Sequence, residues 1–91
     1  MKYEIVPSNQ FRKDLKLAQK RGYDIDKIKK VISALAGGET LEAKYRDHAL
    51  TGDYSGFREC HIQPDWLLIY QINGDRLILF LARTGTPSDL F

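Results

Sequence analysis

The chain has 91 residues, of which 43% are hydrophobic and 29% are charged, and this composition predicts one globular domain, residues 1–91, with a modest core. Its single cysteine, Cys60, excludes an intrachain disulfide and a cysteine-based metal site. The N-terminus lacks the apolar segment of a signal peptide, and the longest apolar run, Leu77–Ala82, is too short to span a bilayer. We therefore expect a soluble, cytoplasmic protein without a membrane partner.

The net charge of +2 is unevenly distributed along the chain. Residues 1–30 carry nine Lys/Arg against four Asp/Glu, whereas residues 31–91 carry five against eight. A basic N-terminal third suits a polyanionic partner such as nucleic acid. Lysine-rich helices are also simply well solvated, so the charge alone leaves both interpretations open.

The first third of the chain predicts a short strand followed by two helices. Lys2–Pro7 alternates weakly and ends at a proline, as a short strand does. A helix is expected from the N-cap at Ser8 or the next residue to Gly22, and a second from the N-cap Asp24 to Gly37–Gly38. The short link between them predicts an antiparallel helical hairpin.

The first helix carries its positive charge on an exposed face, because its basic residues recur at helical spacing on the side away from the apolar stripe. This candidate surface for RNA or the ribosome consists of Arg12, Lys13, Lys16, Lys20 and Arg21.

Residues 39–56, which include His48, lack clear periodicity, and loops of this length tend to be functional or to contain a short helical turn. Two turns then separate three strands, at Pro64–Asp65 and at Asn73–Gly74, the latter a two-residue type I′ turn. The predicted strands are Phe57–Gln63, Trp66–Ile72 and Arg76–Arg83. The order β-α-α-β-β-β predicts an α+β fold, with the helical hairpin on one face of a twisted, mainly antiparallel sheet.

Glu59 and His61 are two residues apart in a strand, so they share a face about 6.5–7 Å apart. A histidine beside a carboxylate can give or take a proton near neutral pH. This pair, followed by Asp65 in the turn, is the candidate active surface.

Two-residue turns would place His61 opposite Leu68, and Leu68 opposite Leu79. That register brings Arg83 to the face of His61, close to the turn at Asp65, and it puts Trp66 and Tyr70 on the same face. A register slip of one residue would reverse the prediction.

This surface suggests three kinds of chemistry: metal binding, nucleophilic catalysis by Cys60 and RNA cleavage. The spacing of the two histidines matches no common metal site, and Cys60 points into the core, where thiols are inert. RNA cleavage without a metal or other cofactor fits better, since it needs a base, an acid and a cation to stabilise phosphate charge. The aromatic residues that could stack on unpaired bases are Tyr54, Phe57, Trp66 and Phe91.

Each of these residues also has a structural interpretation. A strand histidine is often a hydrogen-bonding residue of the fold, Trp66 is often a packing residue, and Arg83 is often an ion-pair partner.

Three motifs carry a resemblance that covers essentially the whole chain. The signature of the YafQ branch of the RelE/ParE superfamily of toxin–antitoxin toxins resembles YRDHALTGDYSGFRECHIQPDWLLIY, residues 45–70. Its closing motif resembles RTGTPSDLF, and its first helix resembles FRKDLKLAQKRGYD.

The resemblance implies a bacterial endoribonuclease of β-α-α-β-β-β fold that enters the ribosomal A site and cuts translated mRNA. It implies a cognate antitoxin that wraps and inhibits the toxin, in a complex that binds operator DNA. The basic first helix would then contact ribosomal RNA.

Position by position, the resemblance also implies roles for individual residues. His48, His61 and Asp65 match catalytic positions, Arg83 matches a residue that stabilises phosphate charge, and Phe91 matches an aromatic placed against RNA. Supporting positions are Glu59, next to the site, and Trp66, in the P-D-W motif.

Pro87 departs from the family, whose closing motif usually has a histidine that serves as a principal acid or base. Either His48, His61 and Asp65 share the proton transfers, or the toxin is weakened. Three alternatives stay open: a catalytically impaired relative that regulates through antitoxin and ribosome binding, a ParE-like gyrase poison, and a plain RNA- or protein-binding domain.

Overall fold

The sheet of the computed structural model, which describes residues 1–91, has five strands in the order β1-β5-β4-β3-β2. The strands are β1 (Glu4–Pro7), β2 (His48–Ala49), β3 (Arg58–Gln63), β4 (Trp66–Asn73) and β5 (Ile78–Gly85). The helices are α1 (Asn9–Lys20), α2 (Ile25–Ala36) and α3 (Pro87–Leu90), with 3₁₀ turns η1 (Ala43–Tyr45) and η2 (Gly52–Tyr54). The predicted α+β class is confirmed.

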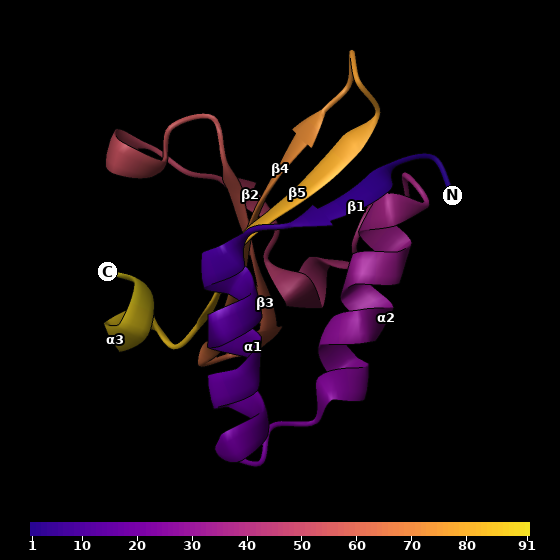
Figure 1. The fold of residues 1–91 in the computed structure, drawn as a ribbon. Helices are drawn as coiled ribbons and strands as arrows, with labels where there is room; N and C mark the ends of the chain where they lie inside the picture. Colours follow the sequence, from indigo (N-terminus) through magenta and orange to yellow (C-terminus); the bar gives the residue numbers. More distant parts are fainter.

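Both long helices begin and end where the sequence predicts, because their termination signals are local. The side chains of Ser8 and Asp24 accept hydrogen bonds from the backbone amides of Phe11 and Asp26, at 2.9 and 3.1 Å. Gly22, with φ +81°, follows the C-cap of α1 in the left-handed region that favours glycine. In Figure 1, α2 lies to the right of the sheet and α3 to the left.

The sheet is mainly antiparallel, as predicted, but it contains one more strand than expected. β1 pairs in parallel with β5, and the other three pairings are antiparallel. The additional strand, β2, and both 3₁₀ turns lie in residues 39–56, where the sequence shows no periodicity. Two residues are too few to display an alternating pattern.

The predicted type I′ turn at Asn73–Gly74 is wrong. Asn73 pairs with Ile78, which leaves a loop of residues 74–77 between β4 and β5. The side-chain oxygen of Asn73 accepts hydrogen bonds from the amides of Asp75 and Arg76, both at 3.1 Å. This capture of two amides by the asparagine stabilises a wider loop than the two-residue turn.

The predicted register is also wrong, because each hairpin contains an irregularity. His61 pairs with Leu67 instead of Leu68, since the register shifts between His61 and Gln63. Leu68 pairs with Thr84 instead of Leu79. Both errors are an odd number of residues, so the side chains of β4 change faces while Arg83 keeps its predicted face. A second register shift, between Ile69 and Tyr70, leaves Leu79 and Leu81 on the core face.

As a result, Arg83 does share the face of His61, whereas Trp66 and Tyr70 do not. Trp66 and Tyr70 are buried in the core beneath α1 and α2, at 0% and 1% exposure. This larger cluster comprises Phe11, Ala18, Ile28, Val31, Leu35, Ala36, Cys60, Ile62, Trp66, Leu68, Tyr70, Leu79 and Leu81.

A smaller cluster lies on the opposite face of the sheet, which carries His61. It consists of Leu67, Ile69 and Leu90, with Tyr54 and Phe57 packed against it. Leu90 belongs to α3, so the C-terminal helix covers part of this face. None of the helices combines the length and apolar character needed to cross a membrane.

Candidate active site

Three polar side chains from β2 and β3 meet on the face that carries α3. His48 lies directly opposite Glu59 in the register, and His61 follows Glu59 by two residues on the same face. Nε2 of His48 and Nε2 of His61 lie 3.6 and 3.5 Å from the same oxygen, Oε1 of Glu59. The predicted proximity of Glu59 and His61 is confirmed, and the structure adds His48 to form a His48–Glu59–His61 triad.

The other nitrogen of each ring fixes the orientation of the imidazole. Nδ1 of His48 donates to the carbonyl oxygen of Arg46 at 2.6 Å, and Nδ1 of His61 donates to that of Pro64 at 3.1 Å. A carbonyl only accepts, so both Nδ1 atoms carry hydrogen. Each Nε2 is therefore the atom that takes up or releases a proton, and both point toward Glu59.

A network behind the triad holds β2 against β3. The Tyr70 hydroxyl donates to Oδ1 of Asp47 at 2.5 Å, and Arg58 lies 3.4 Å from the same carboxylate. Burial and the hydrogen bond to Asp47 raise the pKa of Tyr70, so the phenol remains a donor. Sequence reasoning missed Asp47, which directly precedes His48 and whose partner Tyr70 is 23 residues away.

Arg83 lies in the same cross-strand row as the triad. Glu59 pairs with Ile69, and Ile69 pairs with Arg83, so the two charged residues are separated by one strand. With strands about 4.8 Å apart, their backbones lie about 10 Å from each other. The row thus places Arg83 one strand away from Glu59 on the face of His61, as the sequence predicted by a different register.

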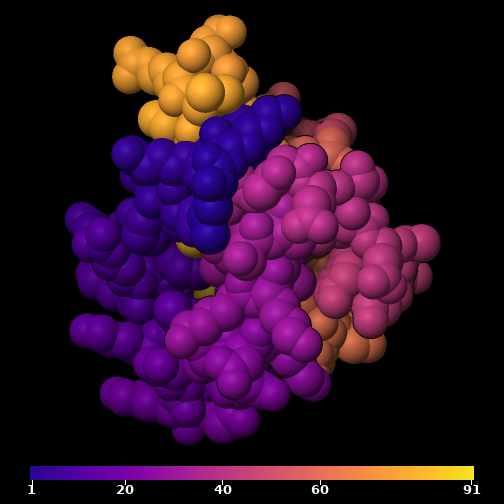
Figure 2. All heavy atoms as spheres, turned by 90° about the vertical axis from the view of Figure 1, so that its right-hand side faces the viewer, coloured from indigo at the N-terminus to yellow at the C-terminus, as the bar shows by residue number.

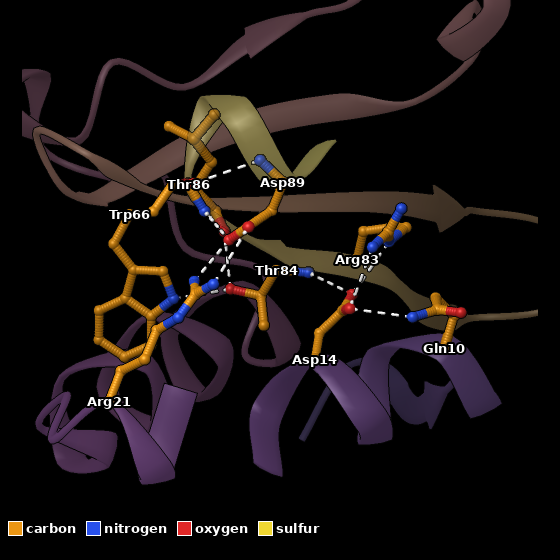
Figure 3. A network of polar contacts seen from close by, with 9 residues as sticks. Gln10, Asp14, Arg21, Trp66, Arg83, Thr84, Thr86 and Asp89 are labelled. Carbon is orange, nitrogen blue, oxygen red and sulfur yellow. Dashed lines mark hydrogen bonds and ion pairs between the residues drawn. The ribbon is translucent and has the colours of Figure 1, made fainter. Parts of the chain in front are cut away.

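A buried carboxylate on α1 aligns the Arg83 guanidinium (Figure 3). Nε and Nη2 donate to the two oxygens of Asp14 at 3.0 and 3.1 Å, while Gln10 and the amide of Thr84 donate to it at 3.0 and 3.2 Å. The hydrogen bond to Asp14 raises the pKa of Arg83, which keeps the cation charged. The sequence held no sign of this pair, whose members are 69 residues apart.

The C-terminal helix α3 is held by an ion pair with the end of α1. Arg21 donates to Asp89 at 2.6 and 3.2 Å, and Asp89 also accepts from the backbone amide of Thr86. Pro87 is exposed at the first turn of α3. Phe91 is 67% exposed, and its ring lies 5.6 Å from that of Tyr54 in an edge-on arrangement.

The other predicted site residues lie apart from the triad or are already engaged. Asp65 is in the exposed turn after β3. Trp66 donates through Nε1 to the Thr84 hydroxyl at 2.9 Å within the core, so the prediction that it faces RNA bases is wrong. Arg21 is occupied by Asp89, while the four remaining basic residues of α1 are exposed: Arg12, Lys13, Lys16 and Lys20.

The structure also bears on nucleophilic catalysis by Cys60 and on metal binding. Cys60 is buried, and burial raises the pKa of its thiol to about 12, which makes it a poor nucleophile. No group of three or more His, Cys, Asp or Glu side chains is arranged to hold a metal ion.

Residues 3–91 match the family model of the bacterial toxin of the type II toxin–antitoxin system, YafQ. The chain is 45% identical over 89 residues to the mRNA interferase toxin YafQ of Escherichia coli K12, covering 97% of this chain and 95% of the relative. It is also similar to a chain of the E. coli DinJ–YafQ complex, with a TM-score of 0.89, 42% identity and 98% of both chains covered. A metal-bound toxin from Helicobacter pylori has a TM-score of 0.92 at 46% identity, with 98% of this chain and 99% of that chain covered.

Proposed function

This chain belongs to the YafQ family of bacterial toxins of type II toxin–antitoxin systems, and from that membership we propose that it is an endoribonuclease that cleaves translated mRNA. The observation that carries the proposal is the His48–Glu59–His61 triad, in which two imidazoles approach one carboxylate oxygen in the same row as Arg83. These groups supply the base, the acid and the cation that cleavage at a phosphodiester requires.

The proposed reaction needs no metal ion. One imidazole accepts the proton of a ribose 2′-hydroxyl, whose oxygen forms a new bond to the adjacent phosphorus. The bond from phosphorus to the 5′-oxygen breaks, and the second imidazole, as imidazolium, protonates that oxygen. The products are a 2′,3′-cyclic phosphate and a 5′-hydroxyl, so one proton is taken up and one is released in each cycle.

The geometry of Glu59 suits the return of that proton. Its side chain is 8% exposed and contacts both Nε2 atoms through one oxygen. A proton gained by one ring can pass through this oxygen to the other ring, which restores the starting state. Asp65, in the exposed turn that follows β3, is the further carboxylate of the proposed site.

Arg83 and Phe91 have complementary roles in the proposal. The guanidinium, aligned by Asp14, stabilises the negative charge that develops on the phosphate oxygens. The exposed ring of Phe91, adjacent to Tyr54, offers a surface on which an unpaired base can stack.

Partners follow from the same family membership. The relative from E. coli forms a complex with DinJ, and we propose that a cognate antitoxin likewise binds this chain and that the complex binds operator DNA. We also propose that cleavage takes place in the ribosomal A site, in the bacterial cytoplasm, with the exposed basic residues of α1 against ribosomal RNA.

A second candidate function is favoured by Pro87. Proline has no titratable group, and it occupies the start of α3, where the family usually has a histidine. A chain without that acid or base would retain antitoxin and ribosome binding and act as a regulator with little cleavage. A ParE-like gyrase poison is the less favoured alternative, because it would not need the triad.

The test is primer extension on an mRNA translated in a reconstituted bacterial system. We expect discrete, ribosome-dependent cuts by the unsubstituted chain, and a loss of about 10²–10⁴-fold in the rate for His61→Gln or Glu59→Gln. Asp75→Asn, in the exposed β4–β5 loop, is the matched control and should cut normally.

Pro87→His separates the two candidate functions. Cuts only after this substitution would favour the regulator, because the scaffold would then be competent but lack a proton carrier. Cuts by neither protein, with both folded by circular dichroism, would contradict the endoribonuclease proposal.

A further inference from the structure

A pocket of about 580 Å³ opens between α2, η1 and the end of β3. We call it the cationic pocket, because four of its nine lining residues are Lys or Arg and none is Asp or Glu. The four are Lys27, Lys30, Lys44 and Arg46. Figure 2 faces this side of the molecule, with the pink segment that follows α2 to the right of the helix and the orange end of β3 below that segment.

None of the four cations is neutralised within the protein. The five ion pairs of the structure engage Arg21, Arg58 and Arg83, together with the two histidines, and they include no residue of the cationic pocket other than His61. Four like charges around one hollow repel each other, and an anion bound among them relieves that repulsion. The pocket therefore has the charge that binding of an anion requires.

The cationic pocket is continuous with the triad. His61 itself lines it, and so do Arg46 and Pro64, whose carbonyl oxygens hold Nδ1 of His48 and of His61. Arg46 adopts φ +50°, an uncommon backbone conformation for a residue other than glycine. An anion in the pocket thus lies against the residues that orient both imidazoles.

We propose that the cationic pocket binds the phosphodiester backbone of the RNA strand next to the bond that is cleaved. This inference rests on the proposed function. His61 lines the pocket, so an RNA strand whose scissile phosphate lies at the triad also passes over the pocket. The volume of about 580 Å³ falls within the range of about 300–1,000 Å³ found for small-molecule sites. The Tyr45 ring also lines the pocket, and Nζ of Lys44 lies 5.2 Å from its centroid.

The pocket extends the RNA contact beyond the basic face of α1. Lys27 and Lys30 project from α2, and Lys44 and Arg46 come from the segment that follows it. The two basic surfaces therefore have different tasks: α1 meets the large polyanion of the ribosome, and the cationic pocket holds the substrate strand in register with the triad.

The test measures binding of a short, fluorescein-labelled single-stranded RNA in which every ribose is 2′-O-methylated and cannot be cleaved. Fluorescence anisotropy gives the dissociation constant between about 50 and 200 mM salt, where each phosphate contact contributes about 0.7 to the slope of log K against log salt. We expect Lys30→Gln with Arg46→Gln to reduce that slope by about 1.4. The control, Lys29→Gln with Arg76→Gln, removes the same charge outside the pocket and should leave the slope unchanged.

Equal slopes for the pocket variant and the control overturn the inference, as does a lack of salt-dependent binding by the unsubstituted chain. A pocket variant that keeps its RNA affinity but loses binding to poly-glutamate would assign the pocket to an acidic protein instead. Cleavage is measured separately on translated mRNA, so failure of the proposed activity does not change the meaning of the salt slopes.

Discussion

Asp14 of α1 and Arg83 of β5 form a two-point ion pair, with Nε to Oδ2 at 3.0 Å and Nη2 to Oδ1 at 3.1 Å. The carboxylate is buried, and its remaining capacity is used by Gln10 and the amide of Thr84. Paired hydrogen bonds of this kind fix the plane of a guanidinium as well as its position. Asp14 is therefore a positioning residue for the cation of the proposed site.

We predict that Asp14→Asn reduces both stability and catalysis. A neutral amide loses the charge-assisted hydrogen bonds, at a cost of about 1.5–3 kcal/mol in the free energy of unfolding. Cleavage should show a lower kcat with a nearly unchanged KM, because Arg83 acts on charge that develops in the transition state. Urea unfolding measures the loss of stability and cleavage kinetics measure kcat, with Asp75→Asn as the control for each. A loss of stability without a change in kcat would show that the Asp14–Arg83 pair is purely structural.

Asp47→Asn should impair cleavage by releasing β2. The substitution weakens the contacts with Tyr70 and Arg58 that hold this two-residue strand beside β3. His48 then loses its fixed position opposite Glu59, so we expect the rate to fall by about tenfold or more while His61 stays in place. The check is the cleavage rate together with the histidine resonances in NMR spectra. An unshifted His48 resonance would contradict this account.

The contact between Arg21 and Asp89 predicts an acid-sensitive C-terminus. The hydrogen bond from Arg21, followed by that from the Thr86 amide, lowers the pKa of Asp89 from its ordinary value of 3.8. A folded-state pKa below the unfolded one means that this carboxylate stabilises the fold fully above about pH 4 and progressively less at lower pH.

Asp89→Asn should therefore be less stable than the unsubstituted chain at pH 7, by about 1 kcal/mol, because the neutral amide weakens the hydrogen bond from the Thr86 backbone amide in the capping box. The difference in melting temperature between the two proteins should shrink as the pH falls below about 4. Thermal melts between pH 7 and pH 3 measure this, and Asp53→Asn should show no such narrowing. A constant difference over the whole range would contradict the assignment.

Cys60 should resist alkylation in the folded protein. Its thiol is buried and its pKa is raised to about 12, first by burial and then by the charges of Asp47 and Glu59. Only the thiolate reacts, so iodoacetamide at pH 8 should label the chain in guanidinium within minutes and the native chain only as fast as it unfolds. Mass spectrometry gives both rates, and equal rates would show that the core opens at this strand.

The sequence predicts the helices well because their signals are local. Ser8 and Asp24 are caps within one turn of the amides they bind, and Gly22 follows directly on α1. The proximity of Glu59 and His61 could be predicted for the same reason, because they are neighbours in one strand. The position of His48 beside them could not, because it depends on the pairing of a two-residue strand, β2, with β3. That strand depends on the contact between Asp47 and Tyr70, which no local pattern reveals.

The strand register explains why the remaining positions of the site could not be predicted from the sequence. A shift between His61 and Gln63 turns Trp66 into the core, and a second shift, between Ile69 and Tyr70, brings Arg83 to the face of His61. Arg83 reached the predicted face only because two odd register errors cancel. Irregularities of this kind arise from packing on both faces of the sheet and not from the alternation of side chains.

The parallel pairing of β1 with β5 joins the first residues of the chain to be synthesised to nearly the last. Ser8 donates to the carbonyl of Ala82 at 2.8 Å, and Asp14 finds Arg83 only when β5 is complete. Such distant contacts form late, since the whole intervening chain must first be available. A nascent copy in which β5 is incomplete therefore lacks the Asp14–Arg83 pair and, in the proposed function, its aligned cation.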